Sequence, residues 1–153
     1  MEKAPEGRKE FSKTDLLGQI LVKKGLIRDK ELQDALSVQK KEKGLLGDIL
    51  VRLGYISEEA LSIALATQSD LIYIPVEKYK ISKDVIKLVP RELVSKYCFL
   101  PLEVIEDLLT IVIANPFDND VVHEIEKVTH CKVSCVIGTK TFITKSISTY
   151  YKG

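Results

Sequence analysis

The front half of this chain is one sequence unit written twice. Residues 16–39 and residues 45–68 align without a gap at an offset of 29, with 12 identities in 24 positions. Self-similarity of this kind marks a structural repeat, in which each copy is a supersecondary unit that buries its apolar face against its neighbour. The front half is therefore expected to fold as two related units joined by a short spacer, residues 40–44.

Each copy of the repeat has the pattern of two short helices. In the first copy Leu17, Ile20 and Leu21 recur at helical spacing, and Gly25 supplies the left-handed residue that commonly ends a helix. A second helix then places four residues of each copy on one face. They are Leu32, Ala35, Leu36 and Gln39 in the first copy, and Leu61, Ala64, Leu65 and Gln68 in the second.

The two copies differ at the start of this second helix. Ser57 is a good N-cap, because its hydroxyl can accept a hydrogen bond from a free backbone N–H of the first turn. Its counterpart, Arg28, is a poor cap and leaves Asp29 as a substitute. We therefore expect the second helix of the first copy to start one residue late.

Gly18 and Gly47 are repeated at positions that we expect near the start of a helix, where glycine costs up to about 1 kcal/mol relative to alanine. A helix start without a side chain in the way can bind phosphate through its free N–H groups. Gln39 and Gln68 end otherwise apolar stripes and could read the edge of a base. The alternative interpretation is that the glycines permit close helix packing and the glutamines cap helix ends.

The repeated pattern LLGxILVxxGxI, followed by LxxALxxQ, resembles the MshEN domain, the N-terminal domain of type II secretion and type IV pilus assembly ATPases. The resemblance continues through residues 88–101 and 108–118 to residues 147–151. It implies a bacterial, non-catalytic regulatory module whose ligand is cyclic di-GMP, with no other cofactor. The implied partners are a secretion or pilus assembly ATPase or an inner-membrane platform protein.

The resemblance also implies which residues bind the ligand: leucines pack on it, the leucine–glycine backbone meets phosphate, and polar side chains touch guanine or phosphate. Carried over position by position, they are Leu17, Gly18, Gln19, Leu32, Leu36, Gln39, Leu46, Gly47, Asp48, Leu61, Leu65 and Gln68.

One position departs from the family pattern. The resemblance implies arginine at the first motif position, where a guanidinium can stack on guanine and pair with phosphate, but this chain has Leu16 and Leu45. Lys40, Lys41 and Lys43 of the spacer could supply positive charge from another direction. The alternative function is a protein-docking module of a secretion or pilus machine that has lost strong nucleotide binding.

The back half alternates strand and helix patterns. The predicted elements are a strand at 71–76, a helical turn capped by Ser82 through Leu88, a helix from Pro90 to about Tyr97, strands at 98–105 and 108–114 joined at Glu106 and Asp107, a helix from Asp118 or Asn119 to about Thr129, a strand at 132–137 and a closing helix at 139–151. The strand, helix and strand in the middle suggest a right-handed parallel crossover.

The predicted fold is therefore α+β: an N-terminal helical tandem repeat of two helix pairs, followed by a small α/β subdomain with a hairpin and a β-α-β crossover. The expected domains are a flexible charged N-terminus over 1–13, the repeat over 14–70 and the α/β subdomain over 71–153.

Several function classes are disfavoured by composition and motifs. Charges are balanced, with 12 of each sign in residues 1–70 and 11 basic against 10 acidic residues afterwards, so neither half is a basic nucleic-acid arm. No apolar run is long enough to cross a bilayer, and a cytoplasmic location without membrane insertion is expected. The chain has no GxxxxGK[ST], GxSxG or HExxH motif, so we expect no catalytic residues and no enzyme.

The strongest metal-ligand residue types gather late in the chain, at His123, His130, Cys131 and Cys135. Their spacing fits no zinc signature well, and the cysteines alternate with Val133 onto one strand face, as small core residues do. We therefore expect no metal site.

Overall fold

A computed structural model describes residues 13–75, 79–116 and 120–151 of the chain. The chain divides into two compact units, Met1–Ala64 and Leu65–Gly153. The predicted flexible segment falls almost entirely outside the described residues, and Lys13 already begins a helix.

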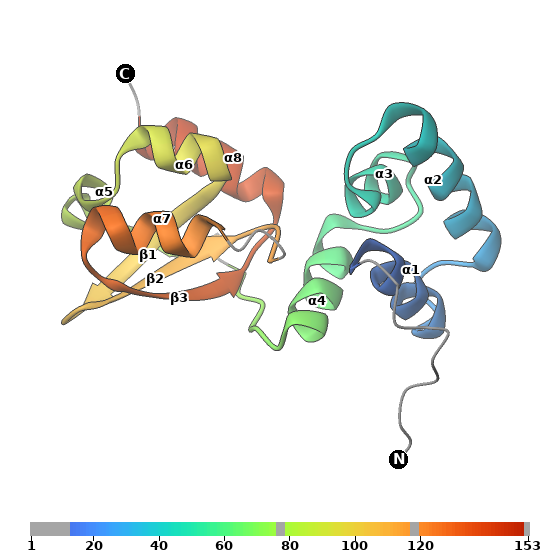
Figure 1. Cartoon of the computed structure of the whole chain (residues 1–153), viewed down its shortest axis with the longest axis horizontal. Helices are drawn as coiled ribbons and strands as arrows, with labels where there is room; N and C mark the ends of the chain where they lie inside the picture. The colour runs from blue at the N-terminus through green and yellow to red at the C-terminus, as the bar shows by residue number, and fades with distance from the viewer. Residues whose placement is uncertain (1–12, 76–78, 117–119, 152–153) are drawn as a thin grey trace, which may run out of the picture. The chain divides into compact units, whose positions relative to one another are not determined.

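The first unit holds the repeat and is helical (Figure 1). Helix α1 spans Lys13–Lys23, α2 spans Asp29–Glu42, α3 spans Leu46–Arg52, and α4 spans Glu58–Ser69 and continues past the unit boundary. Gly25 and Gly54 follow α1 and α3 with φ of +76° and +83°. These left-handed residues end the first helix of each copy, as the repeat pattern predicts.

The start of α2 corrects one prediction. Helices α2 and α4 begin at Asp29 and Glu58, which are the same position of the repeat, so the first copy does not start late. The Glu31 carboxylate accepts a hydrogen bond of 2.8 Å from the Arg28 N–H. In the second copy the Ser57 hydroxyl accepts from the Ala60 N–H at 3.1 Å. A carboxylate three residues into the helix therefore replaces the missing cap side chain.

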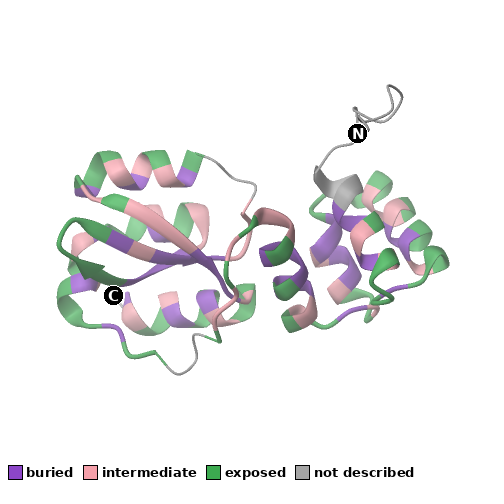
Figure 2. Cartoon of the chain, turned by 90° about the horizontal axis from the view of Figure 1, so that it is seen from below, coloured by how far each residue is buried: buried purple, intermediate pink, exposed green. Residues whose placement is uncertain are grey.

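The second unit is a three-stranded sheet in the order β1-β2-β3, with helices on both of its faces (Figure 2). Strands β1 (Phe99–Ile105) and β2 (Leu108–Ile113) form the predicted antiparallel hairpin, and β3 (Lys132–Ile137) runs parallel to β2. Helix α7, Asp120–Thr129, connects β2 to β3. The predicted hairpin and β-α-β crossover are thus confirmed.

The remaining helices of this unit lie where the caps predict them. Helix α5 spans Lys83–Leu88 with the Ser82 hydroxyl accepting from the Val85 N–H, and α6 spans Arg91–Tyr97 after Pro90. Helix α8 spans Lys140–Tyr150, capped by Thr139. The start predicted for α7 at Asp118 or Asn119 lies outside the described residues.

The strand predicted at 71–76 is wrong. In the described part of this segment, only one isolated parallel bridge forms, between Tyr73 and Ile137. Pro75 has no N–H with which to continue the ladder, and Ile137 is the last residue of β3. Ile72 therefore remains 68% exposed despite its strand-like context.

Candidate functional site

Gly18 lies at a close approach of three helices in the first unit. A Cβ atom at Gly18 of α1 would lie 2.7 Å from Leu32 Cδ1 of α2 and 3.4 Å from Leu46 Cδ2 of α3. The missing side chain therefore makes room for Leu32 of the same copy, while Leu46 of the other copy lies at an ordinary contact distance. Gly18 is the sixth residue of α1, so our expectation that it lies near a helix start is wrong.

Gly47 has the same packing partner in its own copy. A Cβ atom there would lie 2.9 Å from Leu61 Cδ2, and Leu61 is the repeat counterpart of Leu32. Gly47 is the second residue of α3, as the sequence predicts. The same glycine–leucine contact thus occurs twice, which supports close helix packing as one reason for the repeated glycines.

Most of the predicted leucines belong to the hydrophobic core. Leu36 is only partly buried and exposes some of its surface. The buried ones are Leu17, Leu32, Leu46, Leu61 and Leu65. Helix α4 carries Leu61, Leu65 and Gln68 at i, i+4 and i+7, hence on one face. A ligand would therefore contact these leucines mainly through the parts of their side chains that remain accessible to solvent.

The predicted polar residues differ in what they already bind. Gln19 is exposed and Asp48 is half-buried. The Gln39 amide donates a hydrogen bond of 2.9 Å to the Gly44 carbonyl, which holds the spacer turn against the end of α2. Gln68 Oε1 is buried and has no hydrogen-bond partner among the described residues. A buried acceptor without a partner costs free energy. A ligand could reach this oxygen only after neighbouring side chains move, but the oxygen would not lose an existing hydrogen bond by accepting a new one.

Two polar contacts between α2 and the α3 segment were not predicted from the sequence. The Tyr55 hydroxyl donates to Asp34 Oδ2 at 3.1 Å, and this hydrogen bond raises the pKa of Tyr55. Arg52 pairs with Glu42 at 2.6 Å. One sequence signal could have indicated the contact between Tyr55 and Asp34, namely that the two copies differ at these positions. The other copy has Leu26 in place of Tyr55 and Ile63 in place of Asp34.

The histidines and cysteines of the second unit do not form a metal centre in the described part of the chain, where no group of three or more His, Cys, Asp or Glu side chains could hold an ion. Cys131 and Cys135 pack against the core together with Val133. Burial, with a smaller effect of Glu126, raises the pKa of Cys135 to about 11. This thiol is thus protonated at neutral pH and a poor nucleophile.

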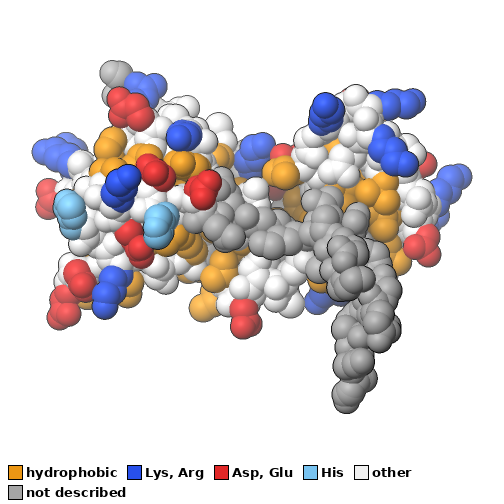
Figure 3. Space-filling view, in the orientation of Figure 1, with side chains coloured by type: hydrophobic (Ala, Val, Ile, Leu, Met, Phe, Trp, Pro, Cys, Tyr) orange, Lys and Arg blue, Asp and Glu red, His pale blue; other side chains and the backbone are white. Residues whose placement is uncertain are grey.

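On the face shown in Figure 3, acidic and basic side chains are interspersed. Among the described helices, none has both the length and the apolar character needed to cross a bilayer.

Comparison with known proteins identifies the family. The model of the MshEN domain matches residues 69–153, more than half of the chain. The chain belongs to the MshEN family. The family match covers the second unit, whereas the relation of the repeat to MshEN domains rests on the comparisons of whole structures and sequences.

Two solved MshEN-type structures are similar over almost their full length. The structure of MshE with cdg (cyclic di-GMP) has a TM-score of 0.77 and 27% sequence identity, covering 88% of this chain and 98% of that one. The N-terminal domain of XpsE has a TM-score of 0.69 with 18% identity, covering 91% and 96%, and shows the fold alone.

A curated relative extends the comparison to a longer protein. The type IV pilus assembly ATPase PilB of Myxococcus xanthus (strain DK1622) is 28% identical over 135 residues, or 88% of this chain. The chain spans about a quarter of the length of that relative, 24%.

Proposed function

We propose that this MshEN domain is a non-catalytic regulatory module that binds cyclic di-GMP through its two motif copies. The observation that carries the proposal is the similarity to MshE with cdg, at a TM-score of 0.77 over 88% of the chain. The proposed binding residues are the twelve carried over from the family pattern. The partner of the module is a type II secretion or type IV pilus assembly ATPase, or an inner-membrane platform protein.

The chemistry of the polar motif residues suits a ligand with two guanines and two phosphates. Gln68 has a buried, unsatisfied acceptor that a guanine N–H could use once neighbouring side chains move, and the half-buried Asp48 carboxylate is an acceptor for the same edge. The Gln39 amide is held by the Gly44 carbonyl, so binding through its N–H groups exchanges one hydrogen bond for another. Ligand binding at Gln39 therefore couples to the spacer turn between the two motifs.

The leucines at the first motif position lower the affinity expected for this ligand. Each charged hydrogen bond that is lost costs about 1.5 to 3 kcal/mol. Lys40, Lys41 and Lys43 are exposed in the spacer and provide positive charge near Gln39. We expect an affinity weaker than that of a domain with arginine at this position, but specific for the dinucleotide.

Calorimetric titration of the intact chain with cyclic di-GMP tests the proposal, with GTP as the control ligand. Gln68→Ala should weaken binding by about tenfold, because it removes one hydrogen bond of roughly 1 to 1.5 kcal/mol. Gln33→Ala, an exposed glutamine on α2 outside the motif, is the matched control and should leave affinity unchanged. Equal heats for cyclic di-GMP and GTP, or no effect of Gln68→Ala, would contradict the proposed site.

A further inference from the structure

A shallow apolar pocket lies in the first unit between the turn after α1 and helix α4. It has a volume of about 160 Å³ and is lined by Lys24, Leu26, Ala60, Ile63 and Ala64. Leu26 is 39% exposed and Ile63 47% exposed. An engineered protein cavity of about 150 Å³ takes up benzene, so this pocket can accept a side chain of that size. None of the lining residues belongs to the proposed nucleotide site.

The other copy of the repeat has different residues at the two exposed apolar positions of the pocket. At the offset of 29, Leu26 corresponds to Tyr55 and Ile63 corresponds to Asp34. The larger Tyr55 side chain donates its hydrogen bond to Asp34 at 3.1 Å and joins the turn after α3 to α2. At these positions one copy thus has a hydrogen-bonded phenol and carboxylate, whereas the other has two apolar side chains that line a hollow.

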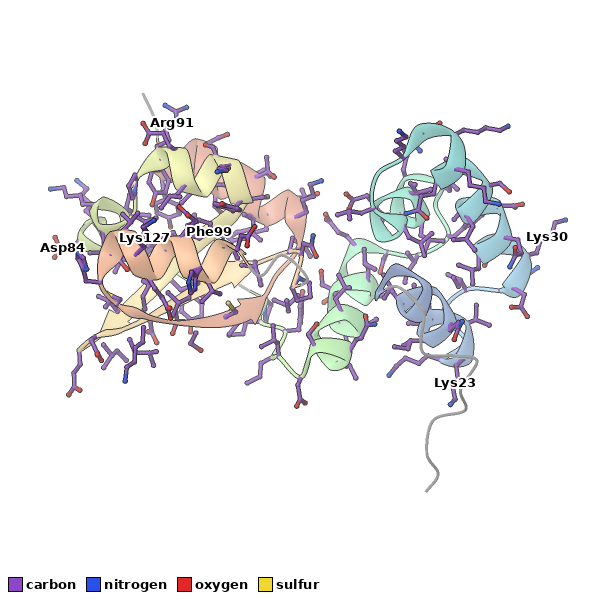
Figure 4. The ribbon with its side chains drawn as sticks, in the orientation of Figure 1. Lys23, Lys30, Asp84, Arg91, Phe99 and Lys127 are labelled. Atoms are coloured by element: carbon purple, nitrogen blue, oxygen red, sulfur yellow. The ribbon has the colours of Figure 1, made fainter. Side chains whose placement is uncertain are left out.

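The two copies of the repeat also differ in their charged side chains. Arg52 is paired with Glu42, but the positions that repeat them are Lys23 and Leu71, so the second carboxylate is absent from the sequence pattern. Within the described ranges neither Lys23 nor Lys24 has an ion pair, and Lys23 projects from the end of α1 (Figure 4). Of the two lysines, Lys24 lines the pocket, which therefore combines an apolar floor with one cation at its edge.

We propose that this pocket docks a segment of a partner protein that inserts one aromatic or branched apolar side chain and sets a carboxylate beside it. The inserted side chain packs on Leu26 and Ile63, and the carboxylate pairs with Lys24 at the pocket edge. An apolar anchor in a pocket, flanked by a complementary charge, is the usual arrangement of a small interface centre.

The probe is a synthetic helical peptide with one phenylalanine flanked by glutamates, added to the full chain while the methyl NMR signals of Leu26 and Ile63 are followed. We expect a saturable shift of both signals, and binding at least about tenfold weaker for the same peptide with lysines in place of the glutamates. Equal binding of both peptides, or of neither, overturns the proposal. So does a shift of the same signals by anionic lipid vesicles in place of the acidic peptide.

Variants of the pocket give the second part of the test. Leu26→Tyr with Ile63→Asp rebuilds the internal pair of the other half and should reduce peptide binding at least about tenfold, as should Lys24→Glu alone. Leu53→Ala changes an exposed leucine at the position that repeats Lys24 and is the matched control. Unchanged binding by folded Leu26→Tyr/Ile63→Asp, or by Lys24→Glu, overturns the proposal.

The two proposals can fail separately. If the double variant keeps its affinity for cyclic di-GMP while losing the peptide, the docking site is independent of the nucleotide site, as the separate residues predict. If the chain binds the peptide but no cyclic di-GMP, the proposed function fails and the docking site stands.

Discussion

Gly18 shows how one residue can serve packing and remain compatible with a ligand. Its absent side chain makes room for Leu32, a core residue, and brings α1 within reach of Leu46 on α3. Glycine inside a helix costs up to about 1 kcal/mol relative to alanine, so the close approach must offset that cost. The repeat of this arrangement at Gly47 and Leu61 indicates that both copies need it.

Replacing Gly18 by alanine should lower the free energy of unfolding by about 1 to 2 kcal/mol, because overpacking outweighs the gain in helix propensity. Gly18→Ala in a Leu32→Ala background should cost less, or stabilise, since the clashing Cδ atoms are gone. Urea unfolding of the four proteins in this double-mutant cycle measures the coupling. Additive effects of the two substitutions would show that the contact at 2.7 Å does not govern the site.

Tyr151 links the closing helix to α5 and is sensitive to alkaline pH. Its hydroxyl donates to the carbonyls of Ile86 at 3.1 Å and Val89 at 3.2 Å. Burial raises the pKa of Tyr151 from 10.0 to about 12. Below the pKa of Tyr151 in the unfolded chain, the phenol is protonated in both the folded and the unfolded states, so its contribution to stability is fully present. Above that pKa the unfolded chain loses the proton first, and the contribution falls.

The free energy of unfolding of the wild-type chain should therefore fall by about 2 kcal/mol from this group as pH rises from about 10 to 12. Tyr151→Phe should be about 1 kcal/mol less stable at neutral pH, because a hydrogen bond is lost, but should lack this part of the alkaline loss. Denaturant unfolding of both proteins across this pH range measures the difference. A gap that stays constant up to pH 12 would show that Tyr151 does not titrate as described.

At the scale of elements, α2 and α4 reach the same start by different chemistry. Glu31 accepts from the Arg28 N–H in one copy, and Ser57 accepts from the Ala60 N–H in the other. The helix therefore starts at the same position in both copies, but the side chain that accepts a backbone hydrogen bond there is Glu31 in one copy and Ser57 in the other. Neither cap can be inferred by copying the other.

Glu31→Ala should destabilise the chain by about 0.5 to 1 kcal/mol, and Ser57→Ala by about 1 kcal/mol. Glu31→Gln is the conservative control, because its amide oxygen can still accept from the Arg28 N–H, and it should keep most of the stability. Thermal unfolding followed by circular dichroism compares the three variants. If Glu31→Gln is as unstable as Glu31→Ala, then the charge of the carboxylate, and not its hydrogen bond from the Arg28 N–H, stabilises the chain.

Much of this element level was predictable from the sequence. Gly25 and Gly54 mark helix ends because only glycine adopts positive φ at little cost, and Ser82, Pro90 and Thr139 mark helix starts. Residues 71–76 were not predictable by composition, since an apolar run indicates a strand but Pro75 and the end of β3 stop the pairing. The Glu31 cap was missed because a single poor cap residue was weighed without its partner three positions later.

At the scale of the whole molecule, divergence between the two copies carries information that their identities do not. The family resemblance predicted the twelve candidate binding residues, but most of the leucines among them also form the core. The contact between Tyr55 and Asp34 could not be predicted from the sequence, because the two residues are far apart along the chain, and only the structure shows their hydrogen bond. Comparing the copies position by position then relates that pair to the open pocket at Leu26 and Ile63.

We propose that the repeated unit is a cyclic di-GMP site and that the leucines at its first motif position limit its affinity for this ligand. Leu45 is the N-cap residue of α3 and is 47% exposed, so an arginine there needs no repacking of the core. The most direct measurement is calorimetric titration of Leu45→Arg beside the wild-type chain with cyclic di-GMP. We expect Leu45→Arg to gain affinity by about tenfold or more, from a new charged contact of roughly 1.5 to 3 kcal/mol. No binding by either protein at near-millimolar ligand, or equal affinity for both, would contradict it.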